Sequence, residues 1–194
     1  GGMGRGVARC LFPLADVRII AVADPAGAYE DDFFYKTQVG RLPLKAEIEA
    51  HYQTTTSGFT CAAYSDFRIM LERETGIDAI VCATPDHLHA YVSVTAMRLG
   101  KHVYCEKPLA HNIWEARLMA RVADETGVAT QMGNLGHARD GMRETCEWLW
   151  DGAIGTVREV HAWAGATRWN KGITAPPTDA PPVPQDLDWD LWLG

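Results

Sequence analysis

The chain has 194 residues, of which 47% are hydrophobic and 22% charged, an ordinary composition for a globular protein. Its formal net charge is −7 and it has no basic run, so we expect no nucleic-acid partner. The five cysteines stand singly, without a CxxC pair, which favours free thiols in a reducing, cytoplasmic location. No apolar run approaches membrane-spanning length, so we expect no membrane partner, while a leader before residue 1 stays open.

Short apolar runs alternate with helical patterns over the first two thirds of the chain. After a glycine-rich turn and helix at the N-terminus, strands are predicted at residues 17–24, 59–64, 78–84, 102–107 and 128–132. Helices are predicted at residues 43–53, 65–74, 86–99 and 112–125. Ser65, Thr84 and Asn112 suit N-cap positions, and Gly127 suits the end of the last helix. The alternation predicts an α/β fold built on a doubly wound parallel sheet.

The pattern changes after Gly133. Residues 139–155 have the pattern of an amphipathic helix, and residues 156–166 alternate polar and apolar side chains as a half-exposed strand does. The tail from Gly165 is rich in proline and tryptophan, which is typical of an extended loop laid on a surface. We therefore expect one domain over residues 1–134 and the beginning of a second domain, α/β or α+β, over residues 135–194.

Unusual residues follow four of the predicted strands. They are Asp24, "TPDHLH" at 84–89, "EKP" at 106–108 and "MGN" at 132–134. In a doubly wound sheet, ligands bind outside the carboxyl ends of the strands. We therefore expect these four clusters to face one crevice.

The glycines at the start of the chain fit part of a dinucleotide-binding fingerprint. Gly1 and Gly4 suit its second and third glycines, whereas the first glycine and its strand would lie before residue 1. Asp24, twenty positions after Gly4, suits the acid that binds the ribose hydroxyls. A flexible terminus and a plain turn acid are the alternatives. Because no arginine or lysine follows Asp24 until Lys36, the sequence favours NAD over NADP.

The cluster "TPDHLH" has both a structural and a functional interpretation. Thr84 and Pro85 can simply begin a helix, with Asp86 favoured by the helix dipole. The two histidines lack the spacing of a zinc pair and a third ligand nearby, so we expect no metal. His87 is the candidate for a cofactor contact, and His89 is the candidate for a structural hydrogen bond, with Glu106 as its partner.

Lys107 is the candidate catalytic residue. It can form a surface ion pair with Glu106, the commonest fate of adjacent opposite charges. In the alternative, the extended Lys-Pro step turns the ammonium into the crevice, where it holds a substrate oxygen and supports proton movement during hydride transfer. A cis peptide at Pro108 would fix that geometry.

The segments "GGMGRG", "VAD", "ATPDHLHA", "GKHVYCEKPLAHN" and "QMGNLGH", in this order, resemble the glucose-fructose oxidoreductase / inositol dehydrogenase / MocA (Gfo/Idh/MocA) family. The resemblance implies an NAD(P)-dependent oxidoreductase of sugars and cyclitols, with a Rossmann domain, a second α/β domain on a large open sheet, and a homo-oligomeric assembly. The family's first strand and its usual catalytic histidine have no counterpart in these residues. The tail "PPVPQDLDWDLWLG" is similar to the family's segment that leads toward the substrate site. The cofactor-binding residues implied are Gly1, Gly2, Met3, Gly4, Asp24, Thr84, Pro85, His87, Glu106, Lys107, Pro108 and Asn134.

Substrate contacts are harder to place. Besides Lys107, the candidates are His137, which can instead flank the next helix, and the loop residues Arg168 and Trp169. The sequence predicts an NAD-dependent dehydrogenase of a sugar, polyol or cyclitol. An NAD-dependent glycosidase that works through transient oxidation and elimination, and a cofactor-binding module without turnover, are the alternatives.

Overall fold

The computed structural model describes residues 1–32, 34–163, 172 and 174–194. The chain divides into two compact units, Gly1–Gly133 together with Pro184–Gly194, and Asn134–Val183. The first unit carries an α/β fold with parallel strands, which confirms the predicted fold class.

The parallel strands of the first unit form two sheets. One pairs β1 (Ala21–Ala23) with β4 (Ala62–Tyr64), and the other has the order β5 (Ala79–Cys82), β6 (His102–Glu106), β7 (Thr130–Gly133). Among the described residues, no strand joins β1 to β5. Hydrophobic contacts hold the two sheets together, because Ile20, Ala21 and Ala23 of the β1 segment pack against the core around β5 and β6.

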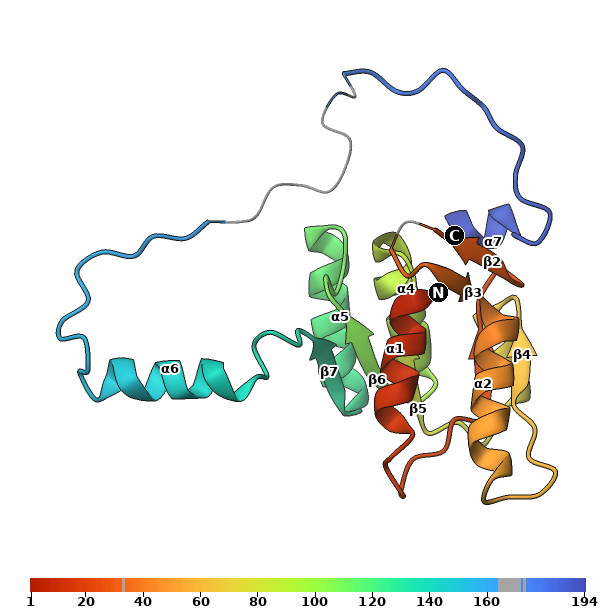
Figure 1. Ribbon diagram of the computed structural model, residues 1–194, viewed down its shortest axis with the longest axis horizontal. Coiled ribbons are helices and arrows are strands. Elements are labelled where there is room, and N and C mark those ends of the chain that lie inside the picture. The colour runs from red at the N-terminus through yellow and green to blue at the C-terminus, as the bar shows by residue number, and fades with distance from the viewer. Residues whose placement is uncertain (33, 164–171, 173) are drawn as a thin grey trace. The chain divides into compact units, whose positions relative to one another are not determined.

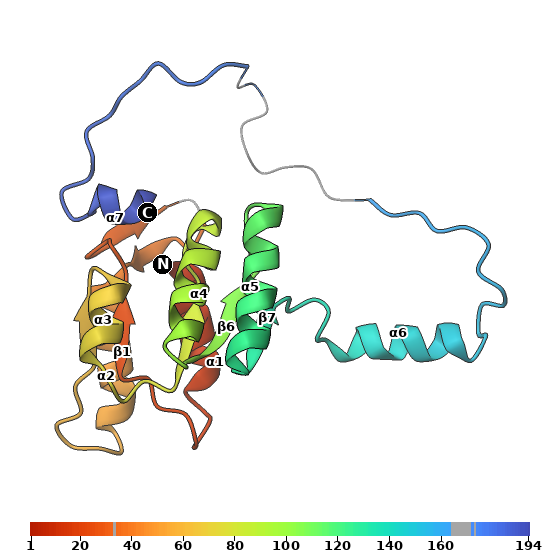
Figure 2. The same cartoon turned by 180° about the vertical axis from the view of Figure 1, so that it is seen from behind.

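Helices cover both faces of these sheets (Figures 1 and 2). α1 (Gly2–Leu11) and α2 (Arg41–Gln53) lie on one face. The other face is covered by α3 (Phe67–Arg73), α4 (His89–Arg98), which follows the short 3₁₀ turn η1 (Asp86–Leu88), and α5 (Ile113–Thr126). α4 is the most deeply buried helix, with Ala96 and Met97 almost fully enclosed against β5, β6 and α5.

The helix ends confirm two of the predicted signals and correct two others. Asn112 caps α5, because its side-chain oxygen accepts a hydrogen bond from the Glu115 backbone N–H at 2.9 Å, and Gly127 ends this helix at φ 65°. The cap of α3 is Asp66, which accepts from the Arg68 N–H at 2.8 Å, and not Ser65. Thr84 is not a cap either, because η1 begins after Pro85 and has no side-chain cap.

The loop predicted between residues 25 and 40 contains an antiparallel hairpin. β2 (Tyr29–Asp31) pairs with β3 (Thr37–Val39), and Lys36 in the turn has φ 49°. Gly40 closes the hairpin at φ 118°, where a Cβ would lie 2.6 Å from the Gly27 carbonyl oxygen. Sequence alternation does not reveal these strands, because each has only three residues.

The second unit contains α6 (Asp140–Trp150), in which no residue is buried. The strand predicted from residue 156 is not formed over 156–163, and residues 164–166 of that prediction lie outside the described ranges. A strand needs a hydrogen-bonded neighbour, and the described residues provide none for this segment. The short helix α7 (Trp189–Leu193) belongs to the first unit. No helix within the described ranges combines the length and the apolar character that crossing a bilayer requires.

Candidate functional site

The glycine-rich start of α1 lies against Asp24. The Asp24 Oδ2 atom accepts a hydrogen bond from the amino nitrogen of Gly1 at 2.6 Å, and its Oδ1 accepts from the Ala26 N–H at 2.9 Å. A Cβ at Gly4 would lie 3.5 Å from that of Ala83, the residue that follows β5. The ends of β1 and β5 therefore both reach the first turn of α1, whose free N–H groups can bind an anion.

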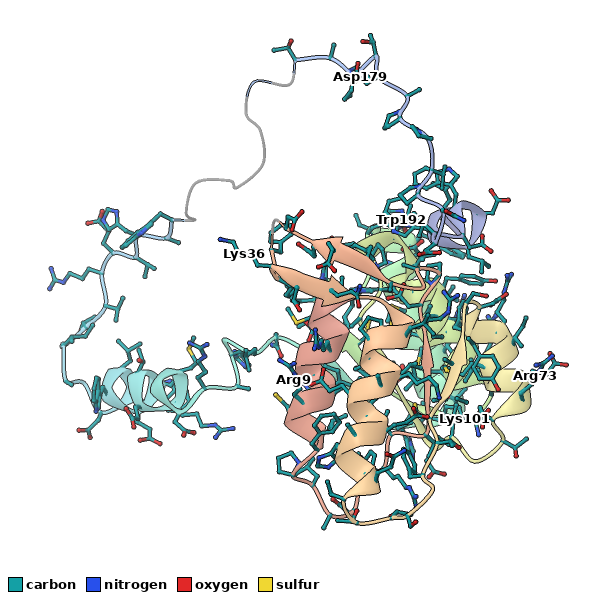
Figure 3. The ribbon with its side chains drawn as sticks, turned by 45° about the vertical axis from the view of Figure 1, so that its right-hand side comes forward. Arg9, Lys36, Arg73, Lys101, Asp179 and Trp192 are labelled. Carbon is teal, nitrogen blue, oxygen red and sulfur yellow. The ribbon has the colours of Figure 1, made fainter. Side chains whose placement is uncertain are left out.

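The β2–β3 hairpin extends over this helix start. The Tyr35 ring packs directly on Gly2, where a Cβ would lie 2.2 Å from the ring. Burial raises the pKa of the Tyr35 hydroxyl, and the charges of Asp31 and Glu106 raise it further. Figure 3 shows Lys36 on the hairpin and Trp192 on α7 at the same end of the first unit.

The "EKP" cluster continues from β6. The Glu106 side chain is buried, and its carboxyl group lies where a Cβ at Gly133 of β7 would be only 2.7 Å away. Burial raises the pKa of Tyr104, and the Glu106 charge adds to this effect. The Lys107 side chain is exposed, and the Lys107–Pro108 peptide bond is cis.

Tyr35 lies near residues from both parallel sheets. It touches Gly2, beside Asp24, and it lies within electrostatic range of Glu106, beside Lys107. Asp24 after β1 and Ala83 after β5 thus both lie at the start of α1, and the charge of Glu106 at the end of β6 reaches the Tyr35 hydroxyl beside it.

The two histidines after β5 have different environments. His87 is half-buried, and its Nε2 donates to the Trp192 carbonyl oxygen at 2.9 Å. His89 is 1% exposed and bonds to the carbonyl oxygens of Thr84 and Pro108. The predicted structural role of His89 is correct, but its predicted partner is wrong, because the backbone of the "EKP" segment and not the Glu106 carboxylate receives the hydrogen bond.

The end of the chain packs on the same edge. The Gly27 N–H donates to the Asp186 carbonyl at 2.8 Å, and the Asp188 N–H donates to the Pro25 carbonyl at 3.1 Å. A cavity of about 470 Å³ lies between this segment and the loop after β1. A second cavity, of about 190 Å³, has mainly apolar walls, among them Ala23, Leu88 and Leu191.

Arg41 is a site residue that the sequence did not reveal. Its Nη1 donates to the carbonyl oxygens of Asp24 at 3.0 Å and of Pro25 at 3.3 Å, and it lines the larger cavity. The absence of a nearby cation, inferred from the spacing to Lys36, is therefore wrong. Arg41 stands seventeen positions after Asp24, and only the fold of the hairpin brings it back.

The remaining predicted residues lie elsewhere in the chain. Met3 is exposed in α1, and Pro85 precedes η1. Asn134 and His137 belong to the second unit, where the His137 N–H donates to the Asn134 carbonyl at 2.9 Å. Arg168 and Trp169 lie outside the described residues.

Parallel strands alternating with helices, with polar clusters beside a glycine-rich helix start, define a Rossmann-type nucleotide-binding domain. Residues 44–134 match the family model GFO_IDH_MocA, described as an oxidoreductase family with an NAD-binding Rossmann fold. Residues 44–134 thus match the Gfo/Idh/MocA oxidoreductase family, which confirms the resemblance seen in the sequence.

Three similar proteins illustrate this family. The chain is 26% identical over 162 residues to 2,7-anhydro-N-acetylneuraminate hydratase of Mediterraneibacter gnavus, covering 84% of this chain and 37% of the relative. It is 38% identical over 91 residues to 1,5-anhydro-D-fructose reductase of Ensifer adhaerens, covering 44% of this chain and 27% of the relative. The crystal structure of myo-inositol 2-dehydrogenase from Lactobacillus plantarum superposes with a TM-score of 0.61 at 24% identity. The superposition covers 81% of this chain and 40% of that enzyme. The chain thus spans well under half the length of each.

Proposed function

We propose that the protein is an NAD-dependent oxidoreductase that transfers a hydride from a sugar, polyol or cyclitol to the nicotinamide. The observation that carries this proposal is the position of the glycine-rich start of α1, which lies against Ala83 after β5 and beside Asp24 after β1. An acid at that place suits the two ribose hydroxyls, and the helix start suits the pyrophosphate. Residues 1–134 are then the cofactor domain, on which Pro184–Gly194 pack, and the chain from residue 135 enters the substrate domain.

The residues present fit such a dinucleotide. Gly1, Gly2 and Gly4 leave the first turn of α1 with no side chain except the exposed Met3, so a phosphate can approach its N–H groups. The apolar cavity beside Ala23 can take a flat base. The bound cofactor supplies the hydride acceptor, and the Tyr35 ring must move away from Gly2 before the pyrophosphate can reach the helix.

Lys107 is the proposed catalytic residue. Its exposed ammonium lies next to the buried Glu106, at the strand end where the nicotinamide of a Rossmann enzyme is expected. The ammonium can donate a hydrogen bond to the substrate oxygen, and the neutral amine, formed when the ammonium releases a proton to water, can accept the hydroxyl proton as hydride leaves the adjoining carbon. His87, Thr84 and Asn134 are the proposed neighbours of the cofactor.

The NAD preference depends on two opposing charges. Asp24 repels a phosphate on the adenosine ribose, whereas Arg41 would attract it. The Arg41 Nη1 atom already donates to two backbone carbonyl oxygens, so it is less available to a phosphate on the ribose. This favours NAD over NADP. We therefore keep NAD as the proposed cofactor.

A second candidate function is elimination and hydration of an anhydro-sugar through transient oxidation, with no net change in the cofactor. The similarity to the 2,7-anhydro-N-acetylneuraminate hydratase, which extends over 84% of this chain, favours it. The same cofactor site and Lys107 would serve both reactions.

Titration of the purified protein with NADH and NADPH, followed by nuclear magnetic resonance, tests the cofactor site directly. We expect NADH to bind more tightly than NADPH and to shift the signals of Gly4, Asp24 and Ala83. Product analysis with a panel of sugars and anhydro-sugars then separates the functions. Net NADH formation supports the dehydrogenase, and conversion without net NADH supports the elimination. Failure of both nucleotides to bind would refute both functions.

A further inference from the structure

His89 makes two hydrogen bonds that a neutral imidazole cannot make together. Its Nδ1 lies 2.5 Å from the Pro108 carbonyl oxygen, and its Nε2 lies 2.9 Å from the Thr84 carbonyl oxygen. A carbonyl oxygen can only accept, so each ring nitrogen must donate a proton. Neutral histidine has one N–H, whereas the imidazolium cation has two. The two contacts therefore require a positively charged ring.

This cation is almost completely shielded from solvent, because His89 is 1% exposed. A charge buried in this way needs an anionic partner. Two ionisable groups lie close to it, the thiols of Cys82 on β5 and Cys105 on β6, both also 1% exposed. Their sulfur atoms and one His89 ring nitrogen all lie within 4.8 Å of one another.

The acidic side chains nearby are directed elsewhere. Glu106 follows Cys105 on β6, so it points to the opposite face of the sheet, where its carboxyl group lies against Gly133. Glu115 on α5 pairs with His111 at 2.8 Å, and Asp86 is exposed. On the other side of the loop, the Lys107 ammonium is exposed and has the same sign as the ring. The negative charge that balances the His89 ring must therefore come from one of the two cysteine sulfur atoms.

Neighbouring hydrogen-bond donors favour a thiolate at Cys82 over a thiol that donates to the His89 carbonyl oxygen, which lies 3.9 Å from the sulfur. The Thr84 hydroxyl lies 3.5 Å from the Cys82 sulfur, and Cys105 is its direct partner in the parallel register. The Cys105 thiol, as a hydrogen-bond donor, lowers the pKa of Cys82 to about 6, and Thr84 and the His89 charge act in the same direction. The same hydrogen bond and burial raise the pKa of Cys105. At Cys61, which is equally buried but lacks such neighbours, burial raises the pKa to about 11.

We propose that His89 is a positioning residue: as an imidazolium ion paired with the Cys82 thiolate, it ties the loop after β5 to the loop after β6. The two carbonyl oxygens that it holds belong to Thr84 and Pro108. These residues flank, respectively, the proposed cofactor contacts at 85–87 and the proposed catalytic Lys107. The pairing itself does not depend on the proposed function, which only gives the two loops their importance.

A metal ion is the competing explanation for two cysteines and a histidine at this spacing. Zinc would need one ring nitrogen at about 2.0–2.1 Å with its lone pair free. Both nitrogens of His89 face carbonyl oxygens instead. The hydrogen bonds therefore favour the ion pair over a metal site.

Nitrogen nuclear magnetic resonance of the histidine rings, on the unmodified protein at neutral pH, tests the pairing without cofactor or substrate. We expect both ring nitrogens of His89 to carry protons, with hydrogen-bond couplings to Thr84 and Pro108. A single N–H on the ring would overturn the proposal. Stoichiometric zinc in the purified protein, lost in His89→Gln, would also overturn it.

Variants of Cys82 test whether its negative charge keeps the His89 ring doubly protonated. Cys82→Ser should remove the ultraviolet absorbance of one thiolate and leave His89 with one N–H, whereas Cys82→Asp should restore the second N–H because it restores the negative charge. The matched control is Cys61→Ser, which should change neither signal. An unchanged thiolate signal in Cys82→Ser, or a doubly protonated ring in that variant, would contradict the pairing.

Hydrogen exchange tests the positioning role. In His89→Gln, we expect amide exchange in 84–88 and 106–110 to accelerate by about tenfold or more, while β1 and β4 stay unchanged. A merely space-filling histidine would instead loosen the surrounding core without this localisation. Uniform acceleration throughout the first unit, or no acceleration in the two loops, would refute the role. None of these outcomes depends on whether the protein binds NAD.

Discussion

At the level of single residues, the two oxygens of Asp24 have separate tasks. Oδ1 orders its own turn by accepting from the Ala26 N–H, and Oδ2 faces the start of α1 at Gly1. Only Oδ2 is directed toward the proposed position of the ribose. An amide at this position keeps the turn but loses the charge.

We therefore predict that Asp24→Asn weakens NADH binding by about tenfold or more, the usual cost of losing a charged hydrogen-bond acceptor. NADPH binding should suffer less, because removing the carboxylate also removes its repulsion of the extra phosphate. Calorimetric titration measures both dissociation constants. Asp16→Asn, in an exposed turn, is the control and should change neither. Equal weakening for the two nucleotides would contradict the ribose assignment.

Lys107 is predicted to affect turnover and not cofactor affinity. In a form of the protein that converts a sugar substrate, Lys107→Ala should lower kcat by about 10²–10⁴-fold, the usual contribution of a general acid–base group. The dissociation constant for NADH should stay within about twofold, since the lysine acts on the substrate hydroxyl. Lys101→Ala, just before the start of β6, is the matched control, and Figure 3 labels this residue. Unchanged turnover in Lys107→Ala would remove the lysine from the mechanism.

At the level of secondary structure, the sequence predicts a helix end best where a single residue determines it. Asn112 and Gly127 were identified at the ends of α5 because a cap and a left-handed glycine act locally. Ser65 and Asp66 are adjacent and have similar cap propensities, so only the backbone geometry selects Asp66. The hairpin of β2 and β3 escaped prediction because three-residue strands leave too short an alternation to recognise.

Gly40, at the junction of the hairpin with α2, is the position where adding a single methyl group should lower stability most. A Cβ there would lie 2.6 Å from a backbone oxygen, and φ 118° is a conformation that side-chain-bearing residues avoid. We predict that Gly40→Ala lowers the free energy of unfolding by about 1–3 kcal/mol, because it strains the junction of the hairpin with α2. Urea denaturation measures the change.

Gly6→Ala is the control for this experiment. Gly6 lies inside α1, and a Cβ there would meet nothing within 4 Å. Alanine should raise the free energy of unfolding by about 0.5–1 kcal/mol, because it favours the helix. Equal effects of the two substitutions, or a stable Gly40→Ala protein, would show that the hairpin junction tolerates a side chain.

For the whole molecule, the candidate site was predictable only as a set of strand ends. The rule that parallel strands present their carboxyl ends to one edge is enough to place Asp24, Thr84 and Glu106 together. It could not bring in Arg41, Tyr35 or Trp192, because these arrive through a hairpin and a tail whose paths depend on long-range packing. The tail was expected on a surface, but its contact with His87 had no sequence signal.

The attachment of the tail to the first unit depends in part on Trp192. Its ring stacks on Trp189 at 5.1 Å and meets the His87 ring edge-on at 5.4 Å. Trp189 lies on α7 itself, so only the pair with His87 joins the tail to the rest of the first unit. Such a ring pair is worth about 0.5–1.5 kcal/mol beyond its buried area, so losing it should measurably increase detachment of the segment. Detachment would break the hydrogen bonds that join Gly27 to Asp186 and Asp188 to Pro25.

We predict that Trp192→Ala accelerates hydrogen exchange at the Gly27 and Asp188 amides by about tenfold, because about 1.4 kcal/mol of attachment energy corresponds to that factor. Trp150→Ala is the control, since its ring is 83% exposed on α6 and touches neither hydrogen bond. Exchange at the core strands β5 and β6 should be the same in both variants, because the tail covers the edge of the sheet and not its centre. If both amides exchange at the original rate in Trp192→Ala, the backbone hydrogen bonds hold the tail without the rings.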